Sequence, residues 1–317
     1  MTNLNGSKVL VTGGTSMLAK AVVPLLYQRN VKVVISERHF CDLTSKEETE
    51  KYLENCQPDY VIHLAGLNSN IQGNIDRPAT IFYATSLINL NVINACIKYK
   101  VKKVISPLSS CAYPANIDVL TEGDLWRSAP HHTVECHAIA KRLLDVYSRF
   151  ARKQNSLNAV TVVINNLFGP NDWFTEKGKV VSSFIRKYVE AKQQDLPSVT
   201  NWGKGVEKRE LTYTPDAANA LVQALEKYDE AVPLNIASGY ETTIKNLAKK
   251  VSDLVGYDGE TLWDETKPDG QMRKKLDITR MKHYLDVKFT DFDLALKETI
   301  DWYISNKELA DNRKIQW

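Results

Sequence analysis

The chain has 317 residues, of which 43% are hydrophobic and 25% charged, so it can bury a sizeable core and is longer than one typical domain. Its 41 basic and 38 acidic residues leave a net charge of +3, and so small an excess argues against a nucleic-acid-binding protein. The N-terminus carries no signal-sequence pattern and no apolar run approaches about 20 residues, so no membrane partner is expected. Five irregularly spaced cysteines, without a Cys-x-x-Cys pair, predict reduced thiols, a cytoplasmic location and no metal site.

The first half of the chain alternates apolar strands with helices. Strands are predicted at 8–12, 31–36, 59–65, 103–106 and 159–164. Helices are predicted at 17–29, after a capping box at 45–48, at 88–99 and at 137–153, with a polar loop at 67–77. Continuously apolar strands indicate a parallel sheet covered on both faces. Right-handed crossovers then make it an α/β, doubly wound sheet of the Rossmann type.

The pattern loosens after residue 165. The segment 171–208 mixes loop and helix, and the stretch after residue 240 reads as helices with short strands. We therefore expect a coenzyme-binding domain at 1–165, to which 209–238 returns, and a smaller C-terminal α/β substrate lobe made mainly of 166–317.

A glycine-rich turn follows the first strand. Gly13 and Gly14 would let the backbone approach a pyrophosphate, and the next helix would offer its N-terminal N–H groups. Ser16 and Ala19 are small but stand where a dinucleotide fingerprint usually has glycines, so an ordinary strand-to-helix turn is the alternative. Two later stretches, Asp42-Leu43 and His63-Leu64-Ala65-Gly66, stand where the adenine-side wall of a dinucleotide site would lie, and they favour the dinucleotide. The predicted coenzyme-contacting residues are Gly13, Gly14, Thr15, Ser16, Met17, Leu18, Asp42, Leu43, Leu64, Ala65 and Gly66.

The end of the second strand carries conflicting signals for the coenzyme. Glu37 would hydrogen-bond the ribose 2′-hydroxyl of NAD(H), whereas Arg38 would accept the 2′-phosphate of NADP(H). A glutamate there can equally point to solvent. The sequence analysis therefore favours NADP(H) over NAD(H), with Arg38 as a contact.

Five stretches along the chain carry a family resemblance. They are Ser109-Ser110-Cys111-Ala112-Tyr113-Pro114; the helix bearing Lys141; Asn166-Leu167-Phe168-Gly169-Pro170-Asn171-Asp172; Trp202-Gly203-Lys204-Gly205 with Arg209; and Lys267-Pro268-Asp269-Gly270. With them, almost the whole chain resembles the GDP-L-fucose synthase family, the GDP-4-keto-6-deoxymannose 3,5-epimerase-4-reductases. These enzymes are extended short-chain dehydrogenases.

The resemblance implies a chemistry for three residues. In this family the 4-keto group acidifies C3 and C5, a Cys removes those protons, and an acid on the opposite face returns them. Hydride from NADPH then reduces C4, and a Tyr protonates the alkoxide. Cys111 matches the family base, Ser109 the ketone-holding Ser, and Lys141 the Lys that lowers the Tyr pKa and is also a predicted coenzyme contact. Without the resemblance they would read as a small hydrophobe, a turn residue and a solvated lysine.

The chain departs from the family at two catalytic positions. His137 stands where the family has Tyr, four residues before Lys141. An imidazole suits acid–base work but reaches less far than a phenol, so reduction is expected to be impaired or rerouted. The alternative is a helix-surface histidine that fills the gap. Lys179 aligns with the acid of the family, usually a His, and the alternative there is a loop lysine on the rim.

The resemblance also implies the substrate contacts and the assembly. Asn166 and Leu167 would lie near the nicotinamide and the sugar, and Lys187 near the diphosphate. A homodimer would pack two helices of each subunit, among them the one with Lys141. The predicted partner is a GDP-sugar, and its predicted contacts are Asn166, Lys187, Trp202, Arg209, Lys267 and Asp269.

Three functions fit the sequence. The first is an active epimerase-reductase in which His137 replaces the Tyr. The second is an altered member that only epimerises or acts on another keto-sugar nucleotide. The third is a catalytically silent protein that binds a nucleotide sugar. Retained Ser109, Cys111 and Lys141 argue against the third, and the two substitutions argue against the first.

Overall fold

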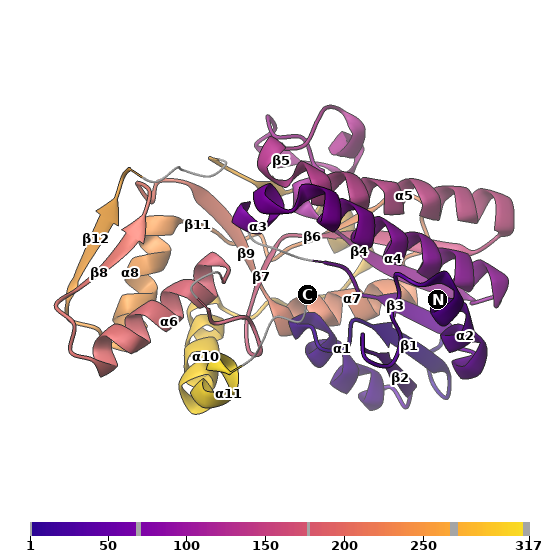
Figure 1. Cartoon of the computed structure of the whole chain (residues 1–317), viewed down its shortest axis with the longest axis horizontal. Coiled ribbons are helices and arrows are strands. Elements are labelled where there is room, and N and C mark those ends of the chain that lie inside the picture. The colour runs from indigo at the N-terminus through magenta and orange to yellow at the C-terminus, as the bar shows by residue number, and fades with distance from the viewer. Residues whose placement is uncertain (1, 68–70, 176–177, 267–271, 313–317) are drawn as a thin grey trace. The chain divides into compact units, whose positions relative to one another are not determined.

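The computed structural model describes residues 2–67, 71–175, 178–266 and 272–312. The chain divides into two compact units, which are described separately (Figure 1). Unit 1 comprises Met1–Asn165, Pro215–Ile236 and Leu276–Lys288, and unit 2 comprises Asn166–Thr214, Ala237–Lys275 and Phe289–Trp317. The chain thus enters unit 2 at residue 166 and returns twice to unit 1.

Unit 1 is built on a parallel six-stranded sheet in the order β10-β6-β4-β3-β1-β2. All six strands run the same way, so their carboxyl ends meet at one edge, where doubly wound sheets bind ligands. The α/β, doubly wound prediction is confirmed. The strands are β1 (Lys8–Thr12), β2 (Lys32–Ser36), β3 (Tyr60–His63), β4 (Lys103–Ser109), β6 (Asn158–Ile164) and β10 (Leu234–Ile236).

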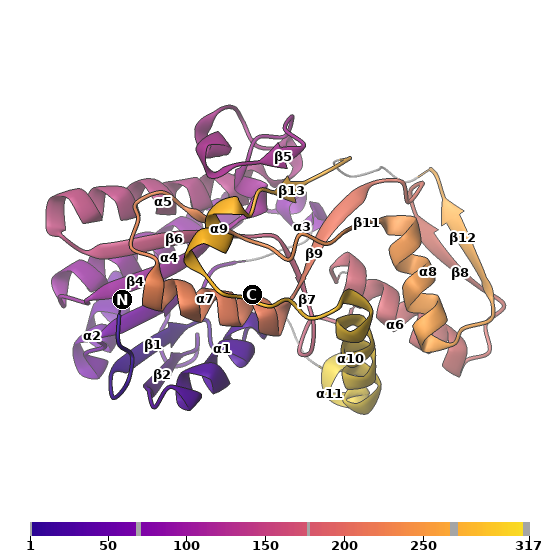
Figure 2. The same ribbon diagram turned by 180° about the vertical axis from the view of Figure 1, so that it is seen from behind.

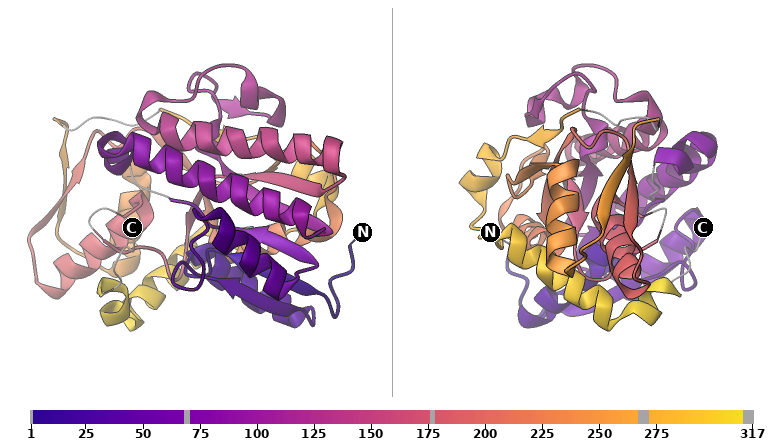
Figure 3. Two further views of the ribbon diagram at one scale, coloured as in Figure 1. Left: turned by 45° about the vertical axis from the view of Figure 1, so that its right-hand side comes forward. Right: turned by 90° about the vertical axis from the view of Figure 1, so that its left-hand side faces the viewer.

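Helices cover both faces of this sheet. The chain crosses from β1 to β2 and then back past β1 to β3, so right-handed crossovers place α1 (Met17–Gln28) and α2 (Lys46–Cys56) on opposite faces. α4 (Pro78–Lys98) and α5 (Glu135–Asn155) lie side by side, with α2 beside α4 (Figure 3). α7 (Thr214–Lys227) lies on the face opposite α4 and α5, as the front and back views show (Figures 1 and 2).

Three predicted boundaries were wrong. The expected loop at 67–77 contains the short helix α3 (Ile71–Asp76), and α4 begins at Pro78 rather than at residue 88. Proline suits the first turn of a helix, but Phe82 and Tyr83 are exposed, which hides the apolar–polar alternation of a surface helix. β4 also continues past residue 106 to Ser109, paired with β6 throughout, although a proline in a central strand usually argues against one.

α4 is long and apolar enough to cross a membrane, although the sequence analysis expected no such segment. Half of its most apolar stretch is buried, and α4 packs against α2 and α5. Core helices of globular domains have the same composition, so this is weak evidence for a membrane span.

Unit 2 packs two small sheets and its helices around aromatic side chains. The rings of Phe174 and Tyr303 stack with centroids 4.5 Å apart, and those of Tyr240 and Phe292 with centroids 4.0 Å apart. One sheet contains β7 (Asn166–Phe168), β9 (Lys208–Tyr213) and β11 (Glu241–Thr243), and the other β8 (Ser198–Trp202) and β12 (Glu260–Asp264). The helices are α6 (Val180–Gln193), α8 (Ile244–Val255), α10 (Phe292–Ser305) and α11 (Lys307–Asp311).

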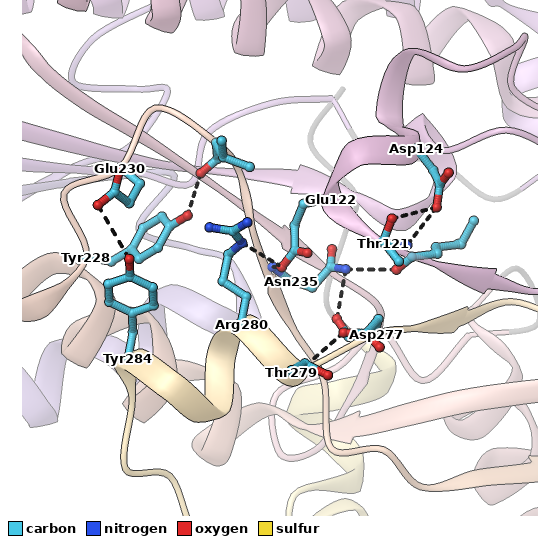
Figure 4. A network of polar contacts seen from close by, with 12 residues as sticks. Thr121, Glu122, Asp124, Tyr228, Glu230, Asn235, Asp277, Thr279, Arg280 and Tyr284 are labelled. Carbon is cyan, nitrogen blue, oxygen red and sulfur yellow. Dashed lines mark hydrogen bonds and ion pairs between the residues drawn. The ribbon is translucent and has the colours of Figure 1, made fainter.

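A buried asparagine in β10 joins three segments of unit 1 (Figure 4). The side-chain amide of Asn235 donates to the carbonyl oxygens of Leu120 at 2.9 Å and Asp277 at 3.0 Å. Its backbone N–H donates to Glu122 at 3.1 Å, and its Oδ1 accepts from the Tyr113 hydroxyl at 2.7 Å. This holds β5 (Val119–Leu120) beside the segment that contains β13 (Lys275–Leu276) and α9 (Thr279–Tyr284).

Asn235→Ala should therefore destabilise unit 1 strongly. Asn235 is completely buried, so its removal leaves several polar groups without their partner, and we expect a loss of about 3 kcal/mol. Urea unfolding followed by circular dichroism measures the loss, with exposed Asn116→Ala as control. A loss below about 1 kcal/mol would show that Asn235 does not hold these segments.

Candidate active site

The glycine turn lies between the ends of β2 and β3. Gly13 has a φ of +69°, and a Cβ on it would come within 2.8 Å of the Ala65 nitrogen. A Cβ on Gly14 would come within 2.1 Å of the Ile35 side chain. Only glycine fits either position, because the obstacle at Gly13 is backbone and the overlap at Gly14 is so large.

The turn leads directly into α1. The side chain of Ser16 caps this helix by accepting from the Ala19 N–H at 3.2 Å. Met17 and Leu18 are buried, whereas Thr15 is exposed. The turn thus has the backbone and the helix N-terminus that a dinucleotide phosphate requires.

Three polar side chains behind the turn connect it to α5. Ala65 donates its N–H to the Thr12 hydroxyl at 3.1 Å, and that hydroxyl lies 2.8 Å from Nδ1 of His63. Nε2 of His63 lies 3.2 Å from Oδ1 of Asn89, whose amide donates to the Ala140 carbonyl at 3.2 Å. Burial, followed by the charge of Lys141, lowers the pKa of His63 to about 3. The sequence analysis included His63 in the predicted adenine-side wall but named no partner for it, and it missed Asn89.

The segment after β2 carries two acidic and two basic residues, of which Glu37 approaches the glycine turn. The Cγ and Oε1 of Glu37 lie 3.3 and 3.5 Å from where a Cβ of Gly14 would be. Arg38 is 56% exposed and reaches Asp42 at 3.8 Å, and His39 lies 3.5 Å from Glu37. Glu37 therefore lies over the glycine turn, although the sequence analysis allowed it to point to solvent.

Asp42 and Leu43 lie in the segment between β2 and α2. Asp42 accepts from the N–H and the hydroxyl of Thr44 at 3.0 and 2.7 Å, and Leu43 is buried. These contacts fix the chain between β2 and α2. They are compatible with the adenine-side wall that the sequence predicted.

Ser109 and Cys111 lie at the carboxyl end of β4. The Ser109 hydroxyl accepts from the Cys111 N–H at 3.2 Å and so begins a single 3₁₀ turn, η1 (Ser110–Ala112). Both side chains are partly exposed, as a base and a ketone-holding hydroxyl must be. Ser109 is opposite Ile164 of β6, so these residues share the ligand-binding edge of the sheet.

His137 and Lys141 lie on one face of α5, one turn apart. The Lys141 ammonium donates to the Pro107 carbonyl at 2.9 Å and lies 3.9 Å from where a Cβ of Gly66 would be. Burial lowers the pKa of Lys141 to about 8. Nδ1 of His137 is shielded from solvent. The neighbouring Cys136 points in a different direction on the helix, and its thiol lies 3.3 Å from Oδ1 of Asn74.

Arg142 also binds α5 to η1, the turn that carries Cys111 (the Cys111 turn). It is 6% exposed and donates to the carbonyl oxygens of Ala112 at 2.7 Å and Ser128 at 2.8 Å. Lys141 and Arg142 are adjacent, so one helical turn binds the backbone on both sides of Cys111. The sequence analysis missed Arg142, which looks like an ordinary basic residue of an amphipathic helix.

The predicted substrate residues fall in unit 2. Lys187 donates to the Thr200 carbonyl at 3.1 Å, and Trp202, at the end of β8, is 70% exposed. The Asn166 amide donates to the Glu210 carbonyl at 3.2 Å. These residues, with Leu167 and the exposed Lys179, belong to a different unit from Cys111.

Three more residues were predicted to bind the substrate: Arg209, Lys267 and Asp269. Arg209 donates to the adjacent Lys208 carbonyl at 2.8 Å. Lys267 and Asp269 lie outside the described residues. Within the part of the chain that the structure describes, no group of three or more His, Cys, Asp or Glu could hold a metal ion.

Comparison with known proteins agrees with this geometry. The model of the NAD dependent epimerase/dehydratase family matches residues 9–237. A GDP-L-fucose synthase of Sinorhizobium fredii is 34% identical over 315 residues, covering 98% of each chain. GDP-L-fucose synthase 1 of Arabidopsis thaliana is 32% identical over 303 residues, covering 95% of this chain and 94% of its own. The crystal structure of a GDP-L-fucose synthetase from Naegleria fowleri bound to NADP has a TM-score of 0.89 at 28% identity and covers 97% of both chains.

The chain belongs to the NAD dependent epimerase/dehydratase family, and within it to the GDP-L-fucose synthases. The predicted family is therefore confirmed. The roles of the individual site residues stay predictions.

Lys141→Met should stabilise the protein at neutral pH. The folded-state pKa of about 8 lies below the ordinary lysine pKa of 10.5, so folding penalises the charged lysine fully below pH 8. That penalty declines as pH rises toward 10.5, where the unfolded side chain also loses its proton. We expect a gain of about 1–3 kcal/mol at pH 7 that largely disappears at pH 10.5. Urea unfolding at both pH values tests this, with exposed Lys153→Met as control, and a gain independent of pH would contradict it.

Proposed function

We propose that this protein is an NADP-dependent epimerase-reductase that converts GDP-4-keto-6-deoxy-D-mannose to GDP-L-fucose. The observation that carries the proposal is the Cys111 turn, which is capped by Ser109 and held by Lys141 and Arg142 of α5. Ser109 and Cys111 thus follow one another at the carboxyl edge of the parallel sheet, in backbone that Lys141 and Arg142 bind. The near full-length similarity to GDP-L-fucose synthases supports the same reaction.

The residues of unit 1 fit a nicotinamide dinucleotide. Gly13 and Gly14 leave no room for a Cβ, and the N-terminus of α1 directly follows them. Arg38 is exposed and available to a 2′-phosphate. When bound, NADPH would supply the hydride for C4. The similar protein from Naegleria fowleri binds NADP, which supports the same coenzyme here.

Cys111 would act as the base of the epimerisation. As a thiolate it would remove the acidified proton at C3 and at C5, while the Ser109 hydroxyl would hold the 4-keto oxygen. A proton must then return from the opposite face for each centre to invert. We assign that step to Lys179, which is exposed at the start of α6. A rim position without chemistry remains the alternative for this lysine.

His137 would protonate the C4 alkoxide as reduction proceeds. It lies one helical turn before Lys141, the spacing that the family uses for its Tyr and Lys. An imidazole ring ends closer to the backbone than a phenol does, so proton transfer would require a bridging water or a closer substrate. Reduction should therefore be the slower part of the reaction. An enzyme that only epimerises, or that uses another keto-sugar nucleotide, is the alternative that this residue favours.

Unit 2 would bind the GDP-sugar, and two copies of the chain would form the enzyme. Trp202 exposes an aromatic face to a base, and Lys187 offers a cation to the diphosphate. The outward residues Tyr83 of α4 and Phe150 of α5 are 66% and 57% exposed. Such apolar rings on two adjacent helices support the predicted homodimer.

Cys111→Ala should abolish deuterium incorporation at C3 and C5. Proton NMR of GDP-4-keto-6-deoxymannose with the protein in deuterated water measures this, because only a base at the sugar exchanges those protons. We expect at least a 100-fold loss, with Cys136→Ala as the matched control. Unchanged exchange would remove Cys111 from the mechanism.

His137→Tyr should raise the rate of C4 reduction, because a phenol reaches farther and Lys141 lies at the spacing that activates it. We expect an increase of about 10-fold or more in NADPH oxidation with the sugar nucleotide, while exchange at C3 and C5 stays within about two-fold. No gain in reduction would show that position 137 does not limit the chemistry.

A further inference from the structure

The coenzyme site contains a carboxylate that a 2′-phosphate would not tolerate well. Glu37 follows the last residue of β2, about 20 residues beyond the glycine turn, where dinucleotide-binding folds place the acidic residue that binds a ribose 2′-hydroxyl. Its side chain does not turn away into solvent. Its Oε1 lies 3.5 Å from where a Cβ of Gly14 would be, so it lies against the turn that would hold the pyrophosphate.

The backbone around Glu37 keeps the carboxylate in place. Its carbonyl accepts from the N–H groups of Phe40 at 2.9 Å and Cys41 at 3.1 Å, which closes a tight turn after β2. The preceding Ser36 carbonyl accepts from the Gly14 N–H at 3.1 Å and binds the strand end to the glycine turn. Glu37 and Gly14 are therefore fixed relative to each other by backbone hydrogen bonds.

The neighbouring basic side chains are more exposed to solvent than Glu37. The side chain of Glu37 is 28% exposed, against 56% for Arg38 and 58% for His39. Arg38 is also shared with Asp42 at 3.8 Å. Charges in water are screened, so the more shielded carboxylate of Glu37 should affect the binding of a ligand at the turn more than the Arg38 guanidinium does.

We propose that Glu37 sets the coenzyme preference and makes the site accept NAD(H) as well as NADP(H). Its carboxylate would accept hydrogen bonds from the adenosine ribose hydroxyls of NAD(H). It would repel the 2′-phosphate of NADP(H), and Arg38, reaching out from the same turn, would offset that repulsion. The inference rests on the proposed coenzyme site and concerns only this chain's discrimination between the two dinucleotides.

The test is isothermal titration calorimetry of the full chain with NADH and with NADPH, without sugar nucleotide. The native protein should bind both, with Kd values within about 10-fold of each other. Glu37→Gln should lower the ratio of the NADPH Kd to the NADH Kd by about 10-fold or more, because it removes the repulsion and a charged acceptor together. Arg38→Met should raise the same ratio. Glu54→Gln removes an equal charge on the exposed face of α2 and should leave the ratio unchanged.

The outcomes separate this inference from the proposed function. Native protein that binds NADPH but not millimolar NADH would overturn it, as would a ratio unchanged within two-fold in both Glu37→Gln and Glu37→Ser. If neither NADH nor NADPH binds, both the role of Glu37 and the proposed reductase activity are overturned. Binding of both coenzymes by a protein that shows no exchange or reduction of the sugar nucleotide would defeat the proposed function and leave the assignment of Glu37 standing.

Discussion

The attachment of α5 to the backbone around Cys111 is the constraint on which the candidate site depends. Lys141 and Arg142 are consecutive, and they donate to the carbonyl oxygens of Pro107 and Ala112. These two carbonyls flank Ser109 and Cys111, so the backbone that carries the thiol is bound to the helix that also carries His137. The anchors are cations taken out of water, and burial lowers the pKa of Lys141 to about 8. Unit 1 thus gives up stability to fix the relative positions of its candidate base and its candidate acid.

The sequence predicted the framework of unit 1 because the physical cause of that framework is local. Strands buried on both faces are continuously apolar, and a turn that meets another backbone needs glycine, so β1 and Gly13 could be recognised without knowing what they contact. The start of α4 was missed because exposed aromatic residues, such as Tyr83, remove the contrast between faces on which periodicity relies. The extent of β4 was missed because its pairing with β6 outweighs the penalty of Pro107.

The polar residues that organise the site could not be predicted in the same way. Asn235 and Tyr113 are 122 positions apart, and His63 and Asn89 meet only because β3 and α4 are neighbours in the folded sheet. A single polar residue inside an apolar run looks like an interruption until its partner is known. The choice between Glu37 and Arg38 had the same difficulty. The two are adjacent and of opposite charge, and only the turn after β2 determines which of them lies over Gly14.

The structure also bears on whether the chain is a silent nucleotide-sugar-binding protein. An apolar side chain at position 141 would avoid the cost of burying an ammonium, so the presence of Lys141 argues for a functional use, either proton chemistry or a coenzyme contact. Such groups are found where proton chemistry needs an amine that titrates near neutrality. The same reasoning does not extend to His137, which is half-buried and need not carry a charge. The geometry therefore supports retained acid–base chemistry at the Cys111 turn more strongly than it supports retained reduction.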